Sequence, residues 1–104
     1  MQQPELWIGL VELKPLDRNV YGAAGAFTNI VTWASDVAGF RNKAETLATT
    51  IDMYVASIEG AGPQAYRTAV GSLTEEIDDM VLRAEVNPNA IVYGTFHRYP
   101  FDEA

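Results

Sequence analysis

The chain has 104 residues, of which 48% are hydrophobic and 20% are charged, so it can form one packed domain and is too apolar for wholesale disorder. Its formal net charge is −7, which disfavours a nucleic-acid-binding surface, because such a surface needs clustered Lys and Arg. The absence of cysteine excludes disulfides, thiolate metal sites and cysteine nucleophiles.

The N-terminal residues carry no basic cluster, and Glu12 interrupts the apolar run that follows them. This pattern argues against a signal peptide. No apolar run approaches the roughly 20 residues of a membrane-spanning helix. We therefore expect a cytoplasmic protein with neither a nucleic acid nor a membrane among its partners.

The first part of the chain is predicted to form two strands. Residues 5–14 are apolar on both faces through their middle, which is typical of a central strand or of one covered on both sides. Pro15 ends this run, and the Asn and Gly content of residues 16–25 predicts a loop. The second strand is predicted at residues 26–34.

A helix is predicted next, with Ser35 or Asp36 as its N-cap. Its buried stripe recurs at three- and four-residue steps and comprises Val37, Phe40, Ala44 and Leu47. The alternation in residues 51–59 predicts a third strand.

The last part of the chain is predicted to form a helix and a strand. Residues 60–63 form a loop, and Pro63 suits the first turn of a helix at about residues 64–85. A turn at residues 87–89 and a final strand at residues 90–97 complete the sequence.

The order ββαβαβ predicts an α+β fold in a single domain spanning residues 1–104. We expect a two-layer sandwich, in which two helices cover one face of a four-stranded, mainly antiparallel sheet. The other face would then meet solvent or another chain.

Alternation assigns polar and aromatic side chains to that uncovered face, although one bulge would reverse the assignment. Tyrosine is enriched in interface cores because it buries ring area and keeps a polar tip. We rank an oligomer contact ahead of a ligand pocket or an ordinary solvated face. The candidate ligand or interface residues are Thr28, Thr32, Trp33, Tyr54, Tyr93, Thr95, His97 and Tyr99.

No constellation for catalysis, for a metal or for a cofactor emerges from the sequence. His97 is the single histidine, whereas an imidazole metal site usually needs two or three. No serine lies in the Gly-x-Ser-x-Gly turn of a hydrolase. The acidic run at residues 75–79 is interpreted as a solvated helix face, with docking of a basic partner as the alternative.

Two runs, Gly25-Ala-Phe-Thr-Asn-Ile-Val-Thr-Trp-Ala continuing to Phe40-Arg41, and Tyr93-Gly-Thr-Phe-His-Arg-Tyr-Pro100, resemble small uncharacterised bacterial proteins. These include proteins encoded by mobile gene cassettes, the cassettes of integrons. The resemblance implies a compact α+β domain that self-associates. It supplies no catalytic residue.

Three functional hypotheses follow. The first is a non-enzymatic interaction or ligand-binding module that self-associates through a sheet face, with a dimer as the first expectation. The second is a small-ligand-binding protein or enzyme with a site near Tyr54, Tyr93 and His97. The third is an acidic inhibitor, such as an immunity-type protein, that binds a basic partner.

Overall fold

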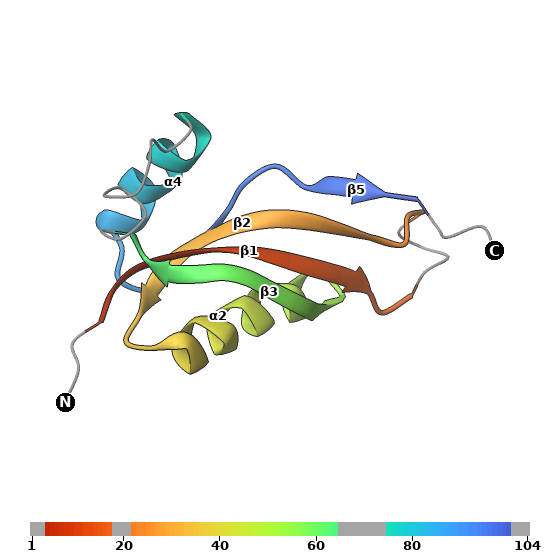
Figure 1. Ribbon diagram of the computed structural model, residues 1–104, viewed down its shortest axis with the longest axis horizontal. Coiled ribbons are helices and arrows are strands. Elements are labelled where there is room, and N and C mark those ends of the chain that lie inside the picture. Colours follow the sequence, from red (N-terminus) through yellow and green to blue (C-terminus); the bar gives the residue numbers. More distant parts are fainter. Residues whose placement is uncertain (1–3, 18–21, 65–74, 101–104) are drawn as a thin grey trace.

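The computed structural model describes residues 4–17, 22–64 and 75–100. In these ranges it contains a five-stranded antiparallel sheet and two helices, which confirms the α+β class (Figure 1). The strands are β1 (Glu5–Pro15), β2 (Gly25–Ala34), β3 (Met53–Pro63), β4 (Ile91–Tyr93) and β5 (His97–Tyr99), and the helices are α2 (Val37–Thr50) and α4 (Glu75–Glu85).

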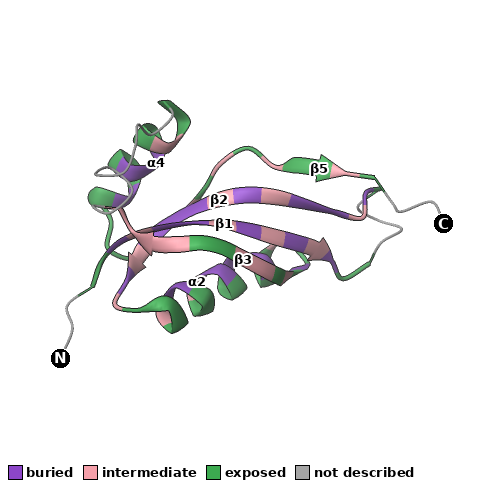
Figure 2. Ribbon diagram, in the orientation of Figure 1, coloured by how far each residue is buried: buried purple, intermediate pink, exposed green. Residues whose placement is uncertain are grey.

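The sheet is built around a hairpin of β1 and β2, whose register runs from Glu5 opposite Ala34 to Leu13 opposite Ala26. Strand β3 pairs with the other edge of β1. Strands β4 and β5 pair one after the other with the free edge of β2. The two central strands are therefore β1 and β2, and Figure 2 shows them as the most deeply buried part of the sheet.

The prediction that both helices cover one face is wrong. Ile30 belongs to a core cluster with α2, whereas its neighbour Val31 belongs to a cluster with α4. Successive residues of a strand point to opposite faces, so the two helices lie on opposite sides of the sheet (Figure 1). We call these sides the α2 face and the α4 face.

The core on the α2 face is closed by Phe40, whose side chain is fully buried. Its ring lies over Gly9, where an added Cβ would come within 2.8 Å of the ring carbon Cζ. The ring also packs against Trp7, with centroids 6.2 Å apart. Glycine at position 9 is required here by the close approach of helix and strand.

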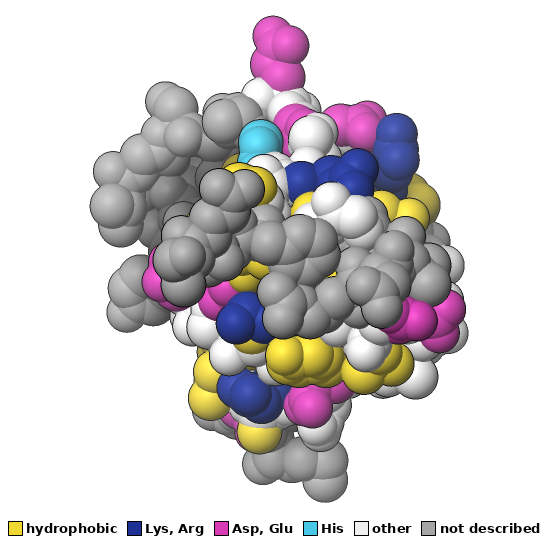
Figure 3. Space-filling model, turned by 90° about the vertical axis from the view of Figure 1, so that its right-hand side faces the viewer, with side chains coloured by type: hydrophobic (Ala, Val, Ile, Leu, Met, Phe, Trp, Pro, Cys, Tyr) yellow, Lys and Arg dark blue, Asp and Glu magenta, His cyan; other side chains and the backbone are white. Residues whose placement is uncertain are grey.

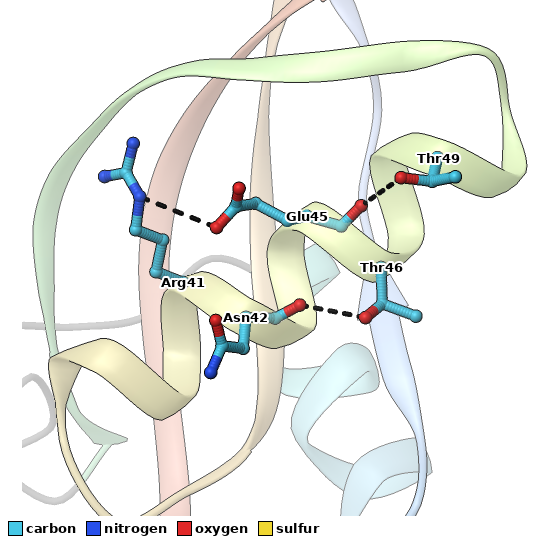
Figure 4. Close-up of polar contacts among 5 residues, drawn as sticks. All are labelled: Arg41, Asn42, Glu45, Thr46 and Thr49. Atoms are coloured by element: carbon cyan, nitrogen blue, oxygen red, sulfur yellow. Dashed lines mark hydrogen bonds and ion pairs between the residues drawn. The ribbon is translucent and has the colours of Figure 1, made fainter.

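Helix α2 begins at the predicted cap. The Asp36 side chain accepts a 2.7 Å hydrogen bond from the Gly39 backbone N–H, which satisfies a donor that has no partner within the helix. The outward surface of α2 is polar, as Figure 4 shows for the Arg41–Glu45 ion pair and for the bonds from Thr46 and Thr49 to backbone carbonyls one turn earlier.

Strand β3 differs from the prediction at both ends. Strand β3 starts at Met53, after a turn in which Asp52 adopts a positive φ of 59°. It continues to Pro63 through residues predicted as a loop, because Gly60 and Ala61 together oppose Gly9 in a bulge.

The predicted final strand divides into β4 and β5. Gly94 lies against α4, where an added Cβ would meet a carboxylate oxygen of Glu76 and the sulfur of Met80. The predicted helix at residues 64–85 is observed as α4 over its second half. Its residues 65–74 lie outside the described part of the chain.

No helix in the described part of the chain is long and apolar enough to cross a membrane.

Candidate functional site

The residues predicted to form one interface do not lie on one face of the sheet. Thr28 and Thr32 are fully buried on the α2 face. The Thr28 hydroxyl donates to the Gly94 carbonyl at 3.1 Å, and the Thr32 hydroxyl donates to the Ala90 carbonyl at 2.7 Å. These two residues hold the segment around β4 to the sheet and are unavailable to a partner, so placing them on an uncovered face was wrong.

Tyr93 and Thr95 also have structural contacts. Tyr93 pairs with Ile30 in the ladder and packs edge-to-face on Phe96, with ring centroids 5.5 Å apart. Thr95 donates to the Glu76 carboxylate from its backbone N–H at 2.8 Å and from its hydroxyl at 2.7 Å. These bonds lower the pKa of Glu76 and tie the β4–β5 connection to α4.

The candidates Tyr54, His97 and Tyr99 lie on the α4 face. Helix α4 covers the end of this face that contains Leu6, Ile8 and Val31. The opposite end is covered by no helix in the described part of the chain (Figure 1). This surface, which we call the open half-face, consists of Leu10, Glu12, Lys14, Phe27, Asn29, Tyr54, Ser57, Glu59, His97 and Tyr99.

The residues of the open half-face form transverse rows, because the ladder places them directly opposite one another. One row crosses the sheet through Ser57, Glu12, Phe27 and His97. Every member of the open half-face is half-buried or exposed. Seen from the end near β5, charged side chains of both signs lie among hydrophobic ones (Figure 3).

Glu12 is the centre of this surface. One of its carboxylate oxygens accepts a 3.0 Å hydrogen bond from the Ser57 hydroxyl of β3. The other accepts a hydrogen bond from the phenol of Tyr99 in β5. Three strands that are distant in sequence are thus linked through one carboxylate.

Gly25 makes the Tyr99 contact sterically accessible. Tyr99 lies opposite Gly25 in the ladder, and a Cβ at this glycine would come within 2.7 Å of the phenol carbon Cζ. The Tyr99 ring therefore lies across Gly25 toward β1. Phe27 flanks it, with ring centroids 5.6 Å apart.

The hydrogen bond shifts the pKa values of both partners in opposite directions. The bond from Tyr99, with help from Ser57 and from the charge of Lys14, lowers the pKa of Glu12 against the effect of desolvation. Burial and the Glu12 carboxylate raise the pKa of Tyr99 to about 12. At neutral pH Glu12 is therefore an ionised carboxylate and Tyr99 a protonated phenol.

Tyr99→Phe is expected to lower the free energy of unfolding by about 1.5–2 kcal/mol at neutral pH, because it removes a hydrogen bond to a charged acceptor. The Glu12 contribution is present above the ordinary pKa of 4.5 and is lost as the pH falls through the lowered value. The Tyr99 contribution is present below pH 10.0 and is lost as the pH rises toward about 12.

Urea unfolding at a fixed protein concentration, at neutral pH and at both extremes, tests this expectation. Tyr93→Phe is the matched control, because Tyr93 is 49% exposed and lies on the α2 face, away from Glu12. Equal stability of Tyr99→Phe and the wild type at neutral pH would show that the Glu12–Tyr99 bond contributes nothing.

Among the described residues, no group of three or more His, Asp or Glu side chains could hold a metal ion. Glu12 and Gly25 were not predicted as site residues. The signal for Glu12 was its position as a charged residue within an apolar strand. Its partner Tyr99 is 87 residues away in the sequence.

Trp33 lies away from the open half-face, at the opposite end of the sheet. Its indole N–H donates to the Ala84 carbonyl of α4 at 2.7 Å. The ring lines a pocket of about 470 Å³ where β2 ends and α2 begins.

Comparison of the chain with protein-family models, curated proteins and solved structures finds no match. The resemblance to gene-cassette proteins stays a prediction, and the function has to be argued from geometry.

Proposed function

We propose that the protein is a non-enzymatic interaction module that acts as a homodimer, in which the open half-faces of two copies pack against each other. The observation that carries the proposal is the half-covered α4 face. One end is packed under α4, and the other presents half-buried rings without a covering helix in the described part of the chain.

The apolar content of the open half-face suits a protein contact. Phe27, Tyr54 and Tyr99 present aromatic rings, and Leu10 presents an aliphatic side chain beside them. Aromatic residues are enriched in the buried centres of interfaces. Polar groups such as Asn29 and His97 at the edge of this cluster fit the polar rim that such interfaces have.

The charge distribution favours a second copy over a basic partner. The chain has 14 acidic residues, but the open half-face contains two of them, Glu12 and Glu59, together with Lys14. Two acidic chains can therefore bring this surface together with little repulsion. A surface specialised for a basic partner would concentrate carboxylates here instead.

The chemistry of the Glu12–Tyr99 pair supports binding over catalysis. A general acid or base works best when its pKa lies near the operating pH. Here the pKa of Glu12 is lowered and that of Tyr99 is raised to about 12. The pair is suited to hold β5 on the sheet and to keep the interface surface rigid.

Isotope-filtered NMR on an equal mixture of ¹³C-labelled and unlabelled chains tests the proposed interface, since it detects contacts between copies alone. We expect intermolecular signals from the Leu10 methyl groups to aromatic protons. Leu82 is the control, because it is exposed on α4 outside the open half-face. Intermolecular signals at Leu82 without any at Leu10 would contradict the proposal.

A further inference from the structure

A separate pocket lies at the end of the sheet opposite to the open half-face. It has a volume of about 470 Å³, which is in the range of about 300–1,000 Å³ that small-molecule sites occupy. Its lining is mostly apolar and comes from four segments of the chain: Pro4, Trp33, Ala34, Ser35, Asp36, Gly39, Lys43 and Pro88.

The apolar wall of the pocket is prearranged around an indole. Trp33 is half-buried, and its N–H bond to the Ala84 carbonyl fixes the ring against α4. Pro4 and Pro88 enter the lining from the segments before β1 and after α4. A fixed indole in a mostly apolar lining favours a planar aromatic group as the occupant.

The charged side chains that line the pocket favour an anionic ligand. Lys43 is half-buried, and in the described part of the chain the ion pairs found are Arg41–Glu45 and Arg83–Asp79. Lys43 therefore contributes a cation that forms no ion pair with another described residue.

Asp36 is the acidic residue in the lining, but its carboxylate already caps α2 through the Gly39 N–H. The positive end of the helix dipole offsets its charge. Asp36 and Lys43 are seven residues apart on α2, about 10 Å along the helix axis. Asp36 is therefore already engaged at the start of α2, and Lys43 enters the lining two turns later.

We propose that this pocket binds a small aromatic carboxylic acid, with the ring against Trp33 and the carboxylate paired with Lys43. The site is separate from the open half-face and does not depend on self-association.

Titration of the ¹⁵N-labelled protein with 1-naphthylacetate, followed by NMR, tests this inference. We expect the indole N–H signal of Trp33 and the Gly39 amide signal to shift with a dissociation constant of about 1 mM or tighter. The indole signal of Trp7, which is buried on the α2 face, should stay unchanged.

Two comparisons isolate the charge. The neutral analogue 1-naphthylacetamide and the variant Lys43→Ala should each weaken binding about tenfold or more, whereas Lys43→Arg should retain binding. Arg41→Ala is the matched control, because Arg41 lies on the exposed surface of α2 and pairs with Glu45. Equal binding of the acid and the amide, an unaffected Lys43→Ala variant, or no shift at Trp33 would overturn the inference.

Discussion

Tyr54→Arg is expected to weaken the dimer about a thousandfold. Tyr54 is 47% exposed on the open half-face, opposite Lys14 in the ladder. Loss of an interface tyrosine that becomes buried on binding costs about 2 kcal/mol. A symmetric dimer loses it twice, and every 1.4 kcal/mol is about tenfold in the dissociation constant.

Sedimentation velocity over a range of concentrations measures this effect. The control is Tyr93→Arg, because Tyr93 is 49% exposed and therefore matches Tyr54, but it lies on the α2 face. Tyr93→Arg should dimerise like the wild type. If both variants weaken the dimer equally, or if Tyr54→Arg leaves it intact, the open half-face is not the interface.

Phe40→Ala is expected to lower the free energy of unfolding by about 3–5 kcal/mol. The Phe40 side chain is fully buried between α2 and the sheet. Gly9 keeps the strand below it free of a side chain. Gly9 has no side chain that could fill the space, so we expect a cavity to remain and the loss to fall in the upper part of this range.

Urea unfolding of both variants measures the difference. Val37→Ala is the control, and its loss should stay within about 0.5 kcal/mol. The prediction that Val37 belongs to the buried stripe was wrong, because this residue at the start of the same helix is 58% exposed. A loss below about 1 kcal/mol for Phe40→Ala would mean that α2 is not anchored by this ring.

The strands β1 and β2 and the start of α2 could be predicted from sequence, although the pairing of the two strands could not, because the signals for each element are local. Runs rich in apolar residues specify the strands, and Asp36 caps the helix through a residue three positions later. Such patterns act over a few residues and do not depend on tertiary structure.

The placement of the helices could be predicted in part. The apolar residues on both faces of residues 5–14 indicated a strand covered on both sides, and Ile8 and Val11 are indeed buried on opposite faces. The predicted two-layer sandwich nevertheless placed both helices on one face of the sheet. Covering one face with both helices would have left Val31 in solvent, whereas α4 buries it.

The centre of the open half-face could not be predicted. Glu12 and Tyr99 meet because β5 pairs with β2 at Gly25, and a short strand at the sheet edge has no strong sequence signal. The bulge at Gly60 and the division of β4 from β5 likewise depend on tertiary contacts. The choice of face therefore required the register of the whole sheet.

Sedimentation equilibrium of the wild-type chain tests the central claim most directly. The single chain has a mass of 11.4 kDa. We predict a mass that rises with concentration to twice this value and stays there, because the open half-face pairs with one copy of itself. A mass equal to that of one chain at every concentration would contradict the proposed function.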